Sequence, residues 1–191
     1  MFQEAVLSLS KKGSWFRSLF LVLGGSCLIA LFTRISLPLP FSPIPLALQG
    51  VVCLMMGAML GRRLGTLTVL AFLLQGAMGL PVFALGRAGF SVLLSPTGGY
   101  LVGYLLGAWV TGSVIERSKS SHRVVLALIL GNLAIYFCGL SQLALFVGAD
   151  KVFKLGMSPF LIGDGIKLII ASQLLRSFQK LGRNTGKTFL S

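Results

Sequence analysis

Apolar residues in this chain fall into six long runs, separated by short segments that are polar, glycine-bearing or rich in proline. A run of about 20 such residues can cross the hydrocarbon core of a bilayer as a helix. The pattern predicts an all-α integral membrane protein whose residues 1–191 form one membrane domain, with residues 1–14 and 176–191 as polar tails. The six expected helices cover residues 15–35, 46–61, 64–80, 97–115, 124–149 and 157–175.

Prolines interrupt the pattern after the first run. Pro38, Pro40, Pro43 and Pro45 lack the backbone N–H that a helix needs, so residues 37–45 cannot form a regular helix. The run that follows is shorter than a bilayer is thick. Either the bilayer thins or the neighbouring helices tilt there, or the proline-rich segment dips below the membrane surface and roofs a recessed pocket.

Composition narrows the class of protein. Hydrophobic residues make up 55% of the chain and charged residues 11%, whereas a soluble domain carries about 25% charged residues. A water-facing surface and a disordered chain both need more polar residues than this. The composition therefore excludes a soluble enzyme and a disordered protein.

The formal net charge of +13 would suggest nucleic-acid binding in a soluble protein. Here the basic residues lie at the ends of apolar runs, where they orient membrane helices. Most of the 17 Lys and Arg residues adjoin the side of the two termini, which predicts a multi-pass protein of the inner or plasma membrane with both termini in the cytoplasm. The other side holds all seven prolines and only a few basic residues, namely Arg34, Arg87, Lys151 and Lys154.

Residues for catalysis or metal binding are scarce. The three cysteines lie singly within apolar runs, and His122 is the single histidine. We expect no metal site and no cofactor, because metal sites need several such ligands. The sequence also lacks a phosphate-binding loop and a nucleophile elbow, so any ATP hydrolysis must come from another chain.

Asp164 and Lys167 are the most informative pair, because both lie inside the last apolar run. A spacing of three places them on one helix face. Each charge is costly inside a membrane when unpaired, so both side chains should face the interior of the bundle. They could form a structural ion pair. They could instead bind a ligand, with Asp164 accepting hydrogen bonds from N–H groups and Lys167 neutralising a carboxylate.

Other polar residues have weaker assignments. Gln49 should lie at the mouth of the pocket, and Tyr100 could stack on a flat ligand or lie in the interfacial belt of aromatic residues. Arg87 could steer an anion or remain a solvated charge. Asn132 and Gln142 are expected to connect helices and not to bind solutes.

Four segments together resemble signatures of the BioY family, the biotin-binding S-components of energy-coupling factor (ECF) transporters. They are Leu39-Pro40-Phe41-Ser42-Pro43-Ile44-Pro45 leading to Gln49, Gly79-Leu80-Pro81-Val82-Phe83-Ala84, Pro96-Thr97-Gly98-Gly99-Tyr100-Leu101, and Gly163-Asp164 with Lys167.

This resemblance implies a six-helix S-component that binds biotin near the outer surface and takes it up without chemistry of its own. It implies that Asp164, Lys167, Tyr100 and the region of Gln49 line the pocket. From the chemistry of the two charged residues we expect Asp164 to bind the ureido group of biotin and Lys167 its carboxylate, although the reverse orientation stays open. The substrate-binding residues would be Asp164, Lys167, Tyr100, Gln49 and Arg87, beneath gating loops that contain Pro40, Phe41, Pro43, Pro45, Pro81 and Phe83.

The resemblance also implies partners, namely a membrane scaffold protein and two ATPases. In this family the first helix meets the scaffold through small residues, and Ser26 and Ala30 are the positions that could do so, unless they pack on a neighbouring helix. Three other functions stay open: an S-component for another small carboxylated vitamin, an intramembrane enzyme that uses Asp164 as a base, and a scaffold without a ligand.

Overall fold

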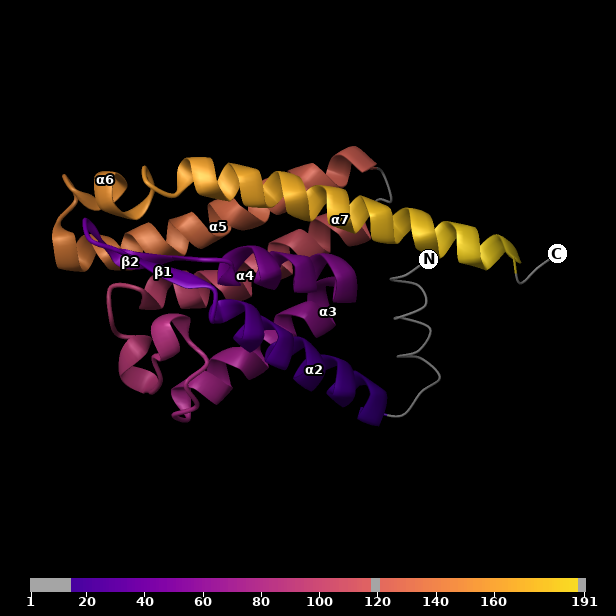
Figure 1. Ribbon diagram of the computed structural model, residues 1–191, viewed down its shortest axis with the longest axis horizontal. Coiled ribbons are helices and arrows are strands. Elements are labelled where there is room, and N and C mark those ends of the chain that lie inside the picture. The colour runs from indigo at the N-terminus through magenta and orange to yellow at the C-terminus, as the bar shows by residue number, and fades with distance from the viewer. Residues whose placement is uncertain (1–14, 118–120, 189–191) are drawn as a thin grey trace.

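The computed structural model describes residues 15–117 and 121–188, and for residues 121 and 179–188 it describes the backbone alone. The order of elements is α2 (Trp15–Thr33), β1 (Ser36–Leu39), β2 (Ser42–Ala47), α3 (Gln49–Ala77), two 3-10 turns η1 (Ala84–Gly86) and η2 (Phe90–Val92), α4 (Gly98–Glu116), α5 (Ser121–Val147), α6 (Val152–Gly156) and α7 (Leu161–Thr188). The β-hairpin and α6 lie at one end of the bundle, and the beginning of α2 and the end of α7 lie at the other (Figure 1).

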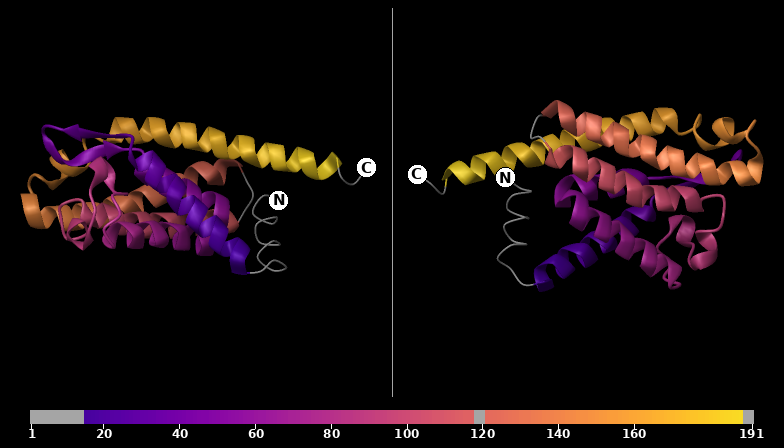
Figure 2. Two further views of the ribbon diagram at one scale, coloured as in Figure 1. Left: turned by 60° about the horizontal axis from the view of Figure 1, so that its bottom comes forward. Right: turned by 180° about the vertical axis from the view of Figure 1, so that it is seen from behind.

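Four helices of the described chain are long and apolar enough to cross a membrane. They are α2, α3, α4 and residues 122–147 of α5. In two further views, α2 diverges from α7, and the last turns of α7 extend past the other helices (Figure 2). The protein is therefore a helical membrane bundle that carries the β-hairpin and the short helix α6 at one end.

The proline-rich segment forms a hairpin, so the fold is mostly helical and the prediction of an all-α fold is wrong here. Strands β1 and β2 pair antiparallel, with an irregularity between Leu37 and Leu39, where Pro38 offers no N–H. Each strand has only one neighbour, and proline is tolerated on such edges. Ser42 and Ile44 of β2 point inward while Pro43 points outward.

Helix α3 covers both the second and the third predicted helix. Gly61 breaks it, with φ 82° and ψ 174°, values that are not helical. The chain folds back there. The evidence is that a Cβ on Gly65 would lie only 2.6 Å from the Cα of Gly57, which is eight residues earlier. The side chain of Glu116 accepts the backbone N–H of Arg62, at 2.7 Å, and so satisfies a donor that the break leaves without a helical partner.

Close backbone contacts hold α3, α4 and α5 together. A Cβ on Gly57 would overlap the carbonyl oxygen of Ala108, and one on Gly103 would lie 2.9 Å from the carbonyl oxygen of Ile135. Lipid gives little hydrophobic drive for association between helices, so close approach at small residues supplies much of the packing energy. Glycine at positions 57 and 103 therefore allows the backbones of these three helices to meet.

The predicted helix boundaries differ from those of the structure mainly near the C-terminus. The last helix begins at Leu161, after the short helix α6 that hydropathy did not indicate. The helix then continues to Thr188, so the polar tail expected from residue 176 is helical. Residues 1–14, the other predicted tail, lie outside the described residues.

Replacing Gly57 with alanine should destabilise the bundle, because the new methyl group meets the backbone of α4 and cannot turn away. We expect a loss of about 1–3 kcal/mol, typical of overpacking, seen as a lower apparent melting temperature in detergent. Gly24→Ala is the matched control, since none of the described residues has an atom within 4 Å of a Cβ there. Equal melting temperatures for the two variants would contradict this packing.

Candidate functional site

Two adjoining cavities lie between the β-hairpin and the helices. We call the first the acid–base cavity; it is lined by Asp164, Lys167, Asn132 and Tyr136 among others. The second, the loop cavity, is lined by Gln49, Phe83, Arg87 and Thr97 among others. The cavities share a wall of Ile44, Pro45, Ala47, Tyr100 and Tyr104.

The predicted ion pair exists and faces the acid–base cavity. Lys167 Nζ lies 3.0 Å from Asp164 Oδ1, and the two side chains are 15% and 23% exposed. Lys167 also donates a hydrogen bond to the carbonyl oxygen of Ala47, at 3.0 Å. An ammonium group has three N–H donors, so one is left to point at a ligand.

Tyr136 completes this group, although the sequence analysis missed it. Its hydroxyl donates to Asp164 Oδ2 at 2.6 Å, and its side chain is buried on α5. Each carboxylate oxygen of Asp164 thus has one protein donor and retains a free lone pair. Tyr136 and Asn132 lie one turn apart on α5, which is the one signal in the sequence that could have linked them.

Tyr100 lines both cavities, but its hydroxyl is already in use. It donates to the carbonyl oxygen of Gly156, at 2.7 Å, and so ties α4 to α6. A Cβ on Gly139 would touch the ring, so a glycine is needed where α5 passes it. The ring is held as a rigid apolar wall, which fits stacking better than hydrogen bonding to a ligand.

The loop cavity contains hydrogen-bond donors without acidic partners. Gln49 is 1% exposed, and its Nε2 has no hydrogen-bond partner among the described residues. Arg87 is half-buried, and no described carboxylate lies in the lining of this cavity. Buried donors normally find an acceptor, so this arrangement points to an acceptor that arrives with a ligand.

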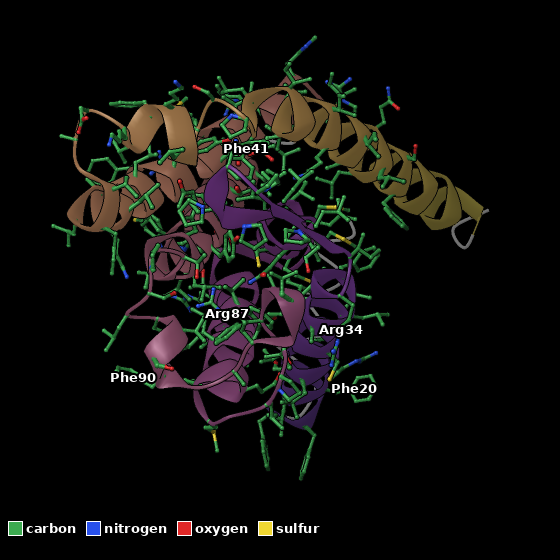
Figure 3. The ribbon with its side chains drawn as sticks, turned by 60° about the vertical axis from the view of Figure 1, so that its left-hand side comes forward. Phe20, Arg34, Phe41, Arg87 and Phe90 are labelled. Carbon is green, nitrogen blue, oxygen red and sulfur yellow. The ribbon has the colours of Figure 1, made fainter. Side chains whose placement is uncertain are left out.

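The predicted gating residues divide into two groups. Pro45 and Phe83 line the loop cavity, whereas Pro40, Phe41, Pro43 and Pro81 are exposed. Figure 3 shows Phe41 at the turn of the hairpin and Arg87 between the hairpin and the 3-10 turns.

Ser42 holds the hairpin at its turn by donating to the carbonyl oxygen of Leu155 in α6, at 2.8 Å.

The expected contact of Ser26 with a partner does not fit the structure. Ser26 has no exposed surface, and its hydroxyl accepts a hydrogen bond from Gln75 Nε2 of α3, at 2.9 Å. The side chain therefore packs on a neighbouring helix, the alternative that the sequence left open. Ala30 is half-buried, so its contact with a partner remains a prediction.

The lining of the acid–base cavity combines apolar side chains with a few polar and charged ones. No group of three or more His, Cys, Asp or Glu side chains converges in the described chain. A mostly apolar cavity with a few placed polar groups is typical of small-molecule recognition.

Replacing one partner of the Asp164–Lys167 ion pair should destabilise the protein more than replacing both partners. Asp164→Leu leaves the Lys167 ammonium half-enclosed without its counter-charge, a loss of about 3–5 kcal/mol for a fully buried pair and less at this exposure. The double variant Asp164→Leu/Lys167→Met removes both charges and should recover most of that loss. Melting temperatures of the single and double variants in detergent test this, and a double variant less stable than Asp164→Leu would contradict it.

Comparison with known proteins shows the family to which the chain belongs. The family model described as "BioY family" matches residues 5–184. The chain is 38% identical to "Biotin transporter BioY" of Thermotoga maritima over 82% of this chain and 92% of that one. It is 36% identical to "Probable biotin transporter BioY" of Pyrococcus horikoshii, over 77% and 93% of the two chains.

A solved structure is also similar, namely the crystal structure of the S-component for biotin from an ECF-type ABC transporter. It superposes with a TM-score of 0.79 at 26% identity, over 86% of this chain and 92% of the other. A family match across nearly the whole sequence and a shared fold lead to one conclusion. The chain is a member of the BioY family.

Proposed function

We propose that this protein is a biotin-binding S-component, a transporter subunit without catalytic activity that captures biotin for uptake. The observation that carries the proposal is the pairing of Asp164 with Lys167 in the lining of a mostly apolar cavity. Biotin has a ureido group with N–H donors and a carbonyl acceptor, an apolar fused ring and a carboxylate tail. Membership of the BioY family supports this ligand.

The free hydrogen-bonding capacity of the ion pair suits the ureido group. One N–H of Lys167 and the remaining lone pairs of Asp164 lie side by side, so together they match an adjacent carbonyl and N–H. The two charged groups are only 3.0 Å apart. Opposite ends of one biotin molecule cannot reach both, which argues against the expected split in which Lys167 binds the carboxylate.

The carboxylate of biotin then belongs in the loop cavity. Gln49 Nε2 and Arg87 supply donors there, and no described carboxylate in the lining competes for them. Between the two ends, Ile44, Pro45 and Tyr100 form an apolar wall against which the fused ring can pack. In this arrangement all five predicted substrate-binding residues lie along one path.

The break at Gly61 supports a proposal for the membrane arrangement, because it divides α3 into two segments. We propose six membrane crossings, made by α2, the two halves of α3, α4, α5 and the first part of α7. The distribution of basic residues favours cytoplasmic termini in a plasma membrane, with the hairpin and the 3-10 turns as gating loops on the outer side.

An energising module fits this role, since the chain has no ATP-binding motif. We propose an ECF scaffold protein and two ATPase subunits as partners. Helix α2 is the least enclosed of the four long apolar helices, with 17% of its residues buried, so it has the most surface to offer a scaffold. Ala30 lies on this helix.

Purified protein should bind biotin in calorimetric titrations. The double variant Asp164→Leu/Lys167→Met should stay folded and lose binding by at least about 100-fold, because both ureido partners are gone. A panel of other carboxylated vitamins is the control for the ligand. Tighter binding of another vitamin, or full binding by the double variant, would contradict the proposal.

Biotin methyl ester distinguishes the two ends of the site. Arg87→Ala should weaken biotin by about 5–100-fold and the ester little, because the ester has no charge to lose. Lys167→Ala should weaken both ligands alike. If instead Lys167→Ala weakened biotin far more than the ester, and Arg87→Ala weakened both alike, the carboxylate would lie at the ion pair.

A further inference from the structure

Two amide side chains on α5 have different surroundings, although the sequence suggested the same helix-connecting role for both. Gln142 fulfils that role, because its Nε2 donates to the carbonyl oxygens of Leu93 and Ser95, both at 2.9 Å. Asn132 does not, since its amide has no polar partner in the part of the chain that the structure describes. An amide inside a membrane bundle is costly without a hydrogen bond, so Asn132 needs another explanation.

The position of Asn132 supplies one. It is half-buried and lines the acid–base cavity together with Asp164 and Lys167. The backbone around it is held in place, because a Cβ on the preceding Gly131 would overlap the hydroxyl of Thr111 on α4. One turn further along α5, Tyr136 holds Asp164 in place. Helix α5 therefore presents one positioning residue and one free amide to the same cavity.

We infer that Asn132 is a ligand-recognition residue that binds the second N–H of a cyclic urea. This rests on the proposed function. The ion pair offers groups for the ureido carbonyl and one N–H, which leaves the other N–H without a partner. The Asn132 side chain has a carbonyl oxygen that can accept it. A cyclic urea is then held at both nitrogens, whereas a ligand with a single N–H leaves the Asn132 amide unpaired.

This inference is tested with biotin and its two isomers methylated at one or the other ureido nitrogen. The wild-type protein should bind biotin and bind both isomers more weakly. The variant Asn132→Leu should bind biotin about 5–100-fold more weakly than wild type. It should bind the isomer whose methyl group faces residue 132 no more weakly than wild type does, because wild-type Asn132 has no N–H to accept from that isomer. Ser141→Ala is the matched control on the same helix, because the Ser141 hydroxyl bonds only to the carbonyl oxygen of Phe137.

Three results would overturn the inference. The first is unchanged biotin binding by Asn132→Leu. The second is an equal loss for biotin and both isomers, which a structural role would give. The third needs no variant: a wild-type protein that discriminates against only one methylated isomer has no partner at the second nitrogen. Failure of the wild-type protein to bind biotin at all would instead remove the proposed function, and the inference with it.

Discussion

An ion pair inside a membrane bundle is the constraint on which the rest of the structure depends. Asp164 and Lys167 can remain charged among apolar helices only if their hydrogen-bonding groups find partners. Lys167 finds one in the carbonyl oxygen of Ala47, and Asp164 finds one in the hydroxyl of Tyr136. These bonds link α7 to the end of the hairpin and to α5, so one pair of charges positions three elements around the cavity.

Backbone packing gives this pair a rigid frame. At Gly57 and Gly103, α4 lies so close to α3 and α5 that there is no room for a side chain. Helices in such contact cannot slide without losing many dispersion contacts at once. The polar groups of the cavity therefore project from a fixed scaffold, which suits recognition of a small, rigid ligand.

The sequence predicted the features that depend on local pattern. Apolar runs located the helices, and a spacing of three placed Asp164 and Lys167 on one face. The gap between the predicted helices 46–61 and 64–80 coincides with the place where α3 folds back. The hairpin escaped prediction because alternating prolines only exclude a helix and do not specify strand pairing. Tyr136 escaped because its partner Asp164 lies 28 residues away, and Ser26 because the sequence could not tell which surface it faces.

The short helix α6 connects more of the molecule than its length suggests. Its last two carbonyl oxygens, on Leu155 and Gly156, accept hydrogen bonds from Ser42 of the hairpin and from Tyr100 of α4. Any outward swing of the hairpin turn has to break the first of these bonds, while the second keeps α6 in place. The five-residue helix thus joins the hairpin turn to α4 through two adjacent carbonyl oxygens.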